Sequence, residues 1–153
     1  MAVKYIWKKR GTTMFRKGTI HDLQGVYELI CQLVRRELDR DMFARVYAEQ
    51  MENDDYYCLV AENDGKLYAV LNLRFDRQLH HCGNCAEIVE FFVSEDARSQ
   101  GTGAQMVRLA EEEAVKRQCV LIEVTSNKAR VHAPRFYMRE GMEQTHAKFV
   151  REF

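Results

Sequence analysis

FFVSEDARSQGTGA, residues 91–104, is the most informative segment of this sequence. An apolar strand ends at Val93, a short polar turn follows, and Gly101 and Gly103 stand where a helix begins. Glycine lets the backbone approach a ligand closely, and the N–H groups of a first helical turn have no partner inside the helix. A pyrophosphate would satisfy these donors and complement the helix dipole. The stretch therefore predicts a strand–turn–helix unit that binds a phosphate-bearing ligand.

Two common phosphate-binding loops are excluded by the residues around these glycines. No Gly-Lys-Ser/Thr follows them, so the loop is not a P-loop. Arg98 holds the place where a dinucleotide-binding Gly-x-Gly-x-x-Gly loop has its first glycine. A glycine-rich turn that only starts a helix is the remaining alternative, and the position after a central apolar strand argues against it.

Hydrophobic periodicity predicts the other elements outward from this unit. Apolar residues at three- and four-residue steps indicate helices, and alternation or short apolar runs indicate strands. Helices are expected from the N-cap Asp22 to about Leu38, over 41–51, over 102–117, and between Pro134 and Gly141. Strands are expected over residues 14–17, 56–62, 67–75, 86–93, 119–124 and 144–150, with turns at 63–65 and 83–84. This order predicts an α/β (α+β) sandwich with a mixed sheet.

Length and charge limit the possible classes of protein. The chain has 153 residues, which predicts a single domain over 1–153, with residues 1–12 as a loose arm or an extra strand. Lys plus Arg and Asp plus Glu both number 23, so the formal net charge is zero. This balance argues against a nucleic-acid partner, which normally meets a strongly basic face.

The compartment is inferred from what the sequence lacks. The basic start has no apolar signal-peptide core, and no apolar run approaches the ~20 residues that span a bilayer. The five cysteines are then expected to be reduced thiols. These features predict a soluble, cytoplasmic protein with no membrane partner.

Three motifs resemble the GNAT family of N-acetyltransferases, and the resemblance covers about residues 14–150. They are Arg-x-x-Gly-x-Gly over 98–103, Asn127 after a strand, and the Phe-Tyr pair at 136–137 before Gly141. The resemblance implies a mixed, mostly antiparallel sheet flanked by helices, with a V-shaped opening between central parallel strands. It also implies acetyl-CoA as co-substrate and, at the level of the family, a homodimer.

The coenzyme-binding residues implied by the resemblance lie at the strand end, in the turn and in the first helical turn. They are Phe92, Val93, Arg98, Ser99, Gln100, Gly101, Thr102, Gly103, Ala104 and Asn127.

Transfer to an amine requires a base, because an alkylammonium with a pKa near ~10 cannot attack a thioester. Glu87 and Glu90 lie in the expected central strand, three residues apart and hence on opposite faces. The resemblance favours Glu87 as the base, with Glu90, a histidine or a purely structural ion pair as alternatives. It assigns Tyr137 as the general acid that protonates the leaving thiolate, with a core tyrosine as the alternative.

The acceptor is the least determined part of the prediction. Segments outside the coenzyme motif, such as 79–81 and 135–146, are similar to members of the family that acetylate aminoalkylphosphonates. We therefore expect an enzyme for a small primary amine, with an aminoalkylphosphonate favoured. A peptide or protein, another small amine, and a non-catalytic acyl-CoA-binding module remain alternatives. The presence of both Glu87 and Tyr137 favours an enzyme.

The segment HHCGNC, residues 80–85, carries four candidate metal ligands. One such cluster without a distant second pair is insufficient for structural zinc, so we predict no metal site. The resemblance instead implies that His80 and His81 face the acceptor and bind an anionic group or a divalent cation. Arg74 would add positive charge for a phosphonate, the alternative being a solvated strand arginine.

Overall fold

The computed structural model describes residues 5–6 and 13–153, with side chains from residue 13 onward. The chain forms two compact units, residues 1–123 and 124–153, and each is described by itself. Of the arm predicted over residues 1–12, a two-residue strand at Tyr5–Ile6 is described, and the remainder lies outside the described residues. That the whole chain is one domain stays a prediction.

The described residues of the first unit form a sheet whose strands follow one another in chain order. Neighbouring strands from β1 to β5 are antiparallel. The six strands are β1 (Tyr5–Ile6), β2 (Met14–Lys17), β3 (Tyr56–Asn63), β4 (Lys66–Gln78), β5 (Gly83–Val93) and β6 (Cys119–Val124).

β5 and β6 are the exception to the antiparallel pattern. Helix α3 (Thr102–Lys116) connects them although they are neighbours in the sheet, which is the crossover that parallel strands need. Their first residues lie together: Asn84 Nδ2 is 3.5 Å from Cys119 Sγ, and a Cβ on Gly83 would lie 2.7 Å from a methyl group of Val120. The predicted mixed, mostly antiparallel sheet is therefore confirmed.

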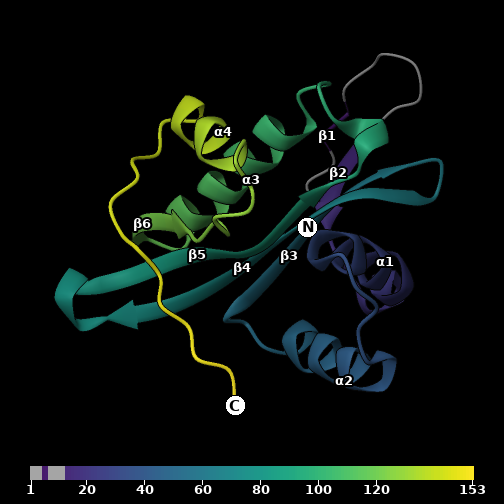
Figure 1. Ribbon diagram of the computed structural model, residues 1–153, viewed down its shortest axis with the longest axis horizontal. Coiled ribbons are helices and arrows are strands. Elements are labelled where there is room, and N and C mark those ends of the chain that lie inside the picture. Colours follow the sequence, from purple (N-terminus) through teal and green to yellow (C-terminus); the bar gives the residue numbers. More distant parts are fainter. Residues whose placement is uncertain (1–4, 7–12) are drawn as a thin grey trace. The chain divides into compact units, whose positions relative to one another are not determined.

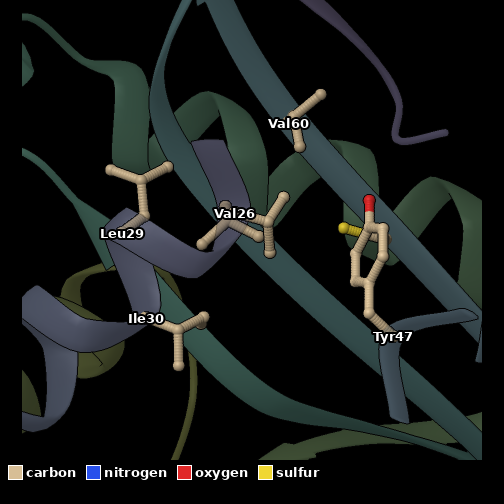
Figure 2. Packing of buried hydrophobic residues seen from close by; sticks show 7 residues of the cluster. Val26, Leu29, Ile30, Tyr47 and Val60 are labelled. Carbon is tan, nitrogen blue, oxygen red and sulfur yellow. The ribbon is translucent and has the colours of Figure 1, made fainter. Parts of the chain in front are cut away.

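Helices cover both faces of this sheet (Figure 1). Helices α1 (Leu23–Val34) and α2 (Arg40–Met51) lie on one face, and α3 lies on the other. Buried side chains of α1 and α2 pack on those of β3 and β4, as Figure 2 shows for part of the cluster. Its buried members are Val26, Leu29, Ile30, Tyr47, Cys58, Val60 and Val70.

Helix α1 is shorter than predicted. It ends at Val34 because Arg35 takes a left-handed conformation with φ +56°, which an α-helix cannot continue. The chain that follows is still held against the helix, since the Tyr27 hydroxyl donates to the carbonyl of Leu38 at 2.8 Å. Asp22 precedes the helix as predicted, but its side chain closes a capping box with Thr19 in the turn before it.

The hairpin between β4 and β5 also differs from the prediction. The turn was expected at residues 83–84, but it lies at Leu79–His81, and Gly83 already belongs to β5. The left-handed residue that reverses the chain is Cys82, with φ +50°. β4 accordingly runs to Gln78, three residues beyond its predicted end.

The second unit contains helix α4 (Ala133–Arg139), with Pro134 in its first turn and Gly141, at φ +91°, just after its C-cap. Both positions are as predicted. The strand predicted over 144–150 is wrong, because the described chain has no regular structure there and almost all of its side chains are exposed. A strand needs a partner for its backbone groups, and residues 125–153 supply none.

Candidate functional site

The glycine-rich turn leads from β5 into α3 as the sequence predicts. Ser99 has φ +61° and Gly101 has φ +78°, and Ser99, Gln100 and Gly101 are exposed. A Cβ on Gly101 would meet no atom within 4 Å, so glycine is needed here for its backbone conformation and leaves open space beside it.

The start of α3 presents backbone donors. Gly101 is the N-cap and carries no side chain that could cap the helix. The first backbone hydrogen bond of the helix runs from the N–H of Gln105 to the carbonyl of Gly101, at 3.0 Å. The N–H groups of Thr102, Gly103 and Ala104 therefore precede the first bonded turn and point out of the helix start. Such a turn fits a diphosphate.

Arg98 and Gln100 are tied to the turn itself. Arg98 Nε donates to the carbonyl of Val93 at 3.0 Å, and its guanidinium lies 5.6 Å from the centre of the Phe92 ring. Gln100 Nε2 donates to the carbonyl of Asp96 at 2.9 Å. These contacts brace the end of β5 against the turn, so the two side chains shape the loop.

A β-bulge in β5 changes the relation between the two candidate bases. Arg74 lies opposite Glu87 and Asn72 lies opposite Glu90, so β5 has one residue more than β4 between these pairs, and Val89 is the extra residue. Arg74 and Asn72 are two apart on a regular strand and share a face. Both glutamates therefore lie on that same face. The prediction that they lie on opposite faces is wrong, because a spacing rule counts residues and cannot detect a bulge.

Glu87 forms an ion pair with Arg74. Its Oε2 lies 2.5 Å from Nη2 of Arg74, and its side chain is 19% exposed. Arg74 also lies 3.8 Å from Asp76 Oδ2. A carboxylate that already accepts a charge-assisted hydrogen bond from a guanidinium is suited to holding Arg74 in place.

Glu90 has a different environment. Its Oε2 accepts a hydrogen bond from Asn72 Nδ2 at 2.9 Å. Burial raises the pKa of Glu90, the bond from Asn72 lowers it, the Glu87 charge raises it and the Arg74 charge lowers it, and the net shift is upward. A carboxylate with a raised pKa is a stronger proton acceptor, which is what a general base needs.

A cavity of about 60 Å³ opens beside Glu90, between α1, α2 and the sheet. Its wall is mostly apolar, and its polar groups are Gln50, Asn72 and Glu90, with the hydroxyl of Tyr47 and the thiol of Cys58 nearby. Gln50 Oε1 accepts the second N–H of Asn72 at 2.9 Å. The sequence analysis missed Asn72 and Gln50, although an asparagine inside the apolar run 67–75 is a detectable signal.

The histidines lie at the tip of the β4–β5 hairpin. The rings of His80 and His81 are 4.0 Å apart, His80 is exposed and His81 half-buried. Cys82 is exposed while Cys85 is buried in β5, and all five cysteines are free thiols. Among the residues that the structure describes, no three His, Cys, Asp or Glu side chains gather where they could hold a metal ion.

The remaining candidates lie in the second unit. Asn127 forms a turn, since its Oδ1 accepts from Ala129 N at 2.9 Å and its carbonyl accepts from Arg130 N at 2.9 Å. Tyr137 lies in α4, half-buried, with its ring 5.2 Å from that of Phe136. Burial raises the pKa of Tyr137, and the Arg130 charge lowers it to a smaller extent. The phenol is thus protonated at neutral pH.

Comparison with known proteins agrees with this arrangement. Residues 23–142 match the acetyltransferase (GNAT) family. The aminoalkylphosphonate N-acetyltransferase of Salmonella typhimurium is 35% identical over 136 residues, which are 89% of this chain and 88% of that protein.

Solved structures show the same fold. A transcriptional regulator from Bacillus halodurans C-125 superposes with a TM-score of 0.85 at 26% identity, over 92% of this chain and 99% of that one. A putative acetyltransferase from Agrobacterium tumefaciens strain C58 gives 0.80 at 25% identity, over 90% and 99%.

The chain belongs to the acetyltransferase (GNAT) family. It is an N-acetyltransferase that uses acetyl-CoA, as the resemblance of its motifs implies. In the described part of the chain, no helix is both long enough and apolar enough to cross a membrane.

Proposed function

We propose that this enzyme moves the acetyl group of acetyl-CoA to the primary amine of a small aminoalkylphosphonate. The observation that carries the proposal is the 35% identity, over 89% of the chain, to an aminoalkylphosphonate N-acetyltransferase.

The spacing of polar groups on β4 supports this acceptor. Arg74 lies two residues beyond Asn72 on the same face, which corresponds to about 6.6 Å along the strand. Side chains on one face of a strand can converge on one small ligand, so a short aminoalkylphosphonate could contact both residues. The amine would lie at Asn72 and Glu90, and the phosphonate would lie toward Arg74, with His80 and His81 further along the hairpin. The guanidinium has five N–H donors, so donors remain on Arg74 for the phosphonate beside the bond to Glu87.

For the proton transfer we propose Glu90 as the general base, acting directly or through a water. The ammonium gives a proton to Glu90, and the amine nitrogen then attacks the thioester carbonyl. The new C–N bond forms, the C–S bond breaks with its electron pair leaving on sulfur, and the nitrogen releases its second extra proton to solvent, which leaves a neutral amide. Glu87 takes the supporting role of holding Arg74, instead of the role of base that the sequence favoured.

The leaving thiolate needs a proton, and Tyr137 is proposed to supply it. A phenol that burial keeps protonated suits this role. The amides of Thr102, Gly103 and Ala104, with the turn from Arg98 to Gly101, are proposed to bind the coenzyme diphosphate. Phe92, Val93 and Asn127 are proposed as its contacts along the strand ends. A homodimer and a divalent cation at His80 and His81 stay predictions.

The test is an assay of free-thiol release from acetyl-CoA across a panel of amines, with added divalent metal and with chelator. We expect turnover with 2-aminoethylphosphonate and aminomethylphosphonate, and none with ethylphosphonate, which lacks the amine. Turnover limited to peptides, polyamines or aminoglycosides would contradict the phosphonate assignment. An effect of chelator would test the cation at the histidines.

A further inference from the structure

Strand β6 has an unpaired edge. Among the described residues it is the last strand of the sheet, and β5 is its only neighbour. Its sequence is CVLIEV, which is apolar apart from Glu123. None of these six residues is buried, and Val120 is 59% exposed, whereas β3, β4 and β5 each contain fully buried residues. The strand therefore presents free backbone N–H and C=O groups beside partly exposed apolar side chains.

This edge lacks the features that usually protect an edge strand. Proteins block such edges with proline, a bulge, several charges or a very short strand. β6 has six residues, no proline and a single charge, Glu123. At the other end of the described sheet, β1 has only two residues. The β6 edge is therefore the part of the sheet that fits a further strand.

Residues 144–150 are suited to become that strand. The segment contains no glycine or proline, and it ends in Phe149 and Val150, which are residue types that favour strands. In the single chain it has no regular structure. Phe149 is 93% exposed and Val150 is 74% exposed, so two large apolar side chains face solvent. Each chain thus carries both an unpaired edge and an unpaired strand-like segment.

We propose that two copies of this chain form a dimer in which residues 144–150 of each copy add a strand to the β6 edge of the other. A twofold exchange uses both edges and both segments at once, so neither is left for a third copy. Backbone hydrogen bonds along β6 provide the affinity, as in other strand additions. Phe149 and Val150 point to opposite sides of the added strand, where each can cover apolar side chains. The inference is independent of the acceptor.

The experiment measures the oligomeric state of the full chain by analytical ultracentrifugation. We expect a dimer for the wild type, and a dimer Kd raised about 10-fold or more in Val120→Lys and in Val150→Pro. Lysine places a charge at the edge, and proline removes an N–H that the added strand needs. Both positions are exposed, so the fold of the single chain should be retained, which circular dichroism checks. A monomeric wild type, or undiminished dimers in both variants, would overturn the proposal.

Val131→Lys is the matched control. Val131 is 68% exposed, and it lies outside both β6 and residues 144–150. The substitution places the same charge at an exposed valine, so it should leave the dimer Kd unchanged. An equal rise of the Kd in Val131→Lys and Val120→Lys would show that the added charge acts without regard to the β6 edge.

Mixing the two interface variants separates strand exchange from other arrangements. A mixed dimer has one intact contact, between β6 of the Val150→Pro chain and residues 144–150 of the Val120→Lys chain. A dimer of either variant alone has none. Fluorescently labelled Val150→Pro protein, sedimented with excess unlabelled Val120→Lys protein, should therefore dimerise more strongly than either variant alone. If the dimer forms through another surface, or if pairing occurs within one chain, mixing gives no gain and the proposal is wrong.

Discussion

Glu87 and Glu90 lie on one face of the sheet but have different neighbours. Arg74 neutralises Glu87 through a 2.5 Å ion pair, whereas Glu90 receives a single amide hydrogen bond and is largely surrounded by apolar side chains. Burial is expensive for a carboxylate that lacks a cation, so the fold tolerates Glu90 at a cost in stability. Such a cost is common where a residue serves chemistry.

Glu90→Gln should separate the effect of Glu90 on turnover from its effect on stability. We expect turnover to fall at least about 100-fold, because the base is lost, with coenzyme A affinity unchanged. The free energy of unfolding should rise by about 1 kcal/mol near pH 8, because a buried charge is removed. Glu87→Gln is the comparison and should mainly raise the KM of the acceptor, since it frees Arg74. Full turnover in Glu90→Gln would remove Glu90 from the mechanism.

The pH dependence of turnover follows from the raised pKa of Glu90. The groups that face it are Glu87, Arg74, Asn72, Gln50, and Cys58 with Tyr47 on the cavity side. The base must be ionised, so kcat should fall as the pH drops through a value above the ordinary glutamate pKa of 4.5. Asn72→Leu removes the hydrogen bond that lowers this pKa, so the acidic limb should move to higher pH. A limb that does not move would contradict the assignment.

The raised pKa of Glu90 also makes the free energy of unfolding depend on pH. The direction is opposite to that of a carboxylate held in an ion pair, whose pKa is lowered in the folded state. A raised pKa in the folded state favours the protonated form, so the contribution of Glu90 to stability is present at low pH and is lost as the pH rises through the raised pKa. The stabilisation by Glu90→Gln should therefore be largest at high pH. Chemical unfolding at pH 5 and pH 8 measures the difference.

Tyr137→Phe tests the proposed acid. We expect kcat to fall by roughly 100-fold, because the leaving thiolate loses its proton donor, with little change in the Kd of coenzyme A. The ring and its packing on Phe136 are retained, so the thermal stability should be nearly unchanged. Phe136→Leu in the same helix controls for general effects of altered packing. An unchanged kcat in Tyr137→Phe would exclude the role.

At the scale of the element, the sequence around the start of α3 provides both a rigid strand end and a turn that leaves the first amides of the helix free. The apolar strand β5 provides a rigid end, and the turn at Ser99 and Gly101 reverses the chain so that α3 begins with its first amides outward. Arg98 and Gln100 then hold the turn in place through backbone carbonyls. If the coenzyme binds as proposed, its binding should depend on the strand–turn–helix unit rather than on any single side chain.

Gly101→Ala should weaken this unit. Alanine at φ +78° is strained, so we expect a loss of about 1 kcal/mol in stability together with a higher Kd for coenzyme A. Gly65 is a matched control, because it has φ +76° and equally open space but lies in the β3–β4 turn. Gly65→Ala should cost the same stability and leave the Kd unchanged. Equal Kd values in both variants would show that the turn does not bind the coenzyme.

At the scale of the whole molecule, binding of coenzyme A should raise the free energy of unfolding of the enzyme. Coenzyme A at about 100 times its Kd is expected to stabilise the native state by about 2.7 kcal/mol, which is about 5–10 °C in Tm for a chain of this size. If residues 1–153 form one domain, calorimetry should show one transition that shifts as a whole. Two transitions, with one insensitive to coenzyme A, would refute the single domain.

Most elements could be predicted from the sequence because local patterns determine them. The alternation over 67–75 and the apolar run 86–93 predicted strands, and the glycines at 101 and 103 predicted the turn that begins α3. The failures lie where partners are distant. Residues 144–150 have a strand-like pattern but no partner strand in their unit, and the turn after β4 moved to Leu79–His81 because pairing with β5 extends that strand.

Residues close together in the chain were enough to predict the glycine-rich turn and the order of the elements as far as α4, and their motifs indicated the family. The face that each glutamate occupies could be read only from the fold, because the bulge at Val89 depends on the register between β4 and β5. It also decided that Asn72 lies between Gln50 and Glu90, which are 22 and 18 residues away in the chain. A side chain acquires such a role only when packing brings distant elements into hydrogen-bonding distance.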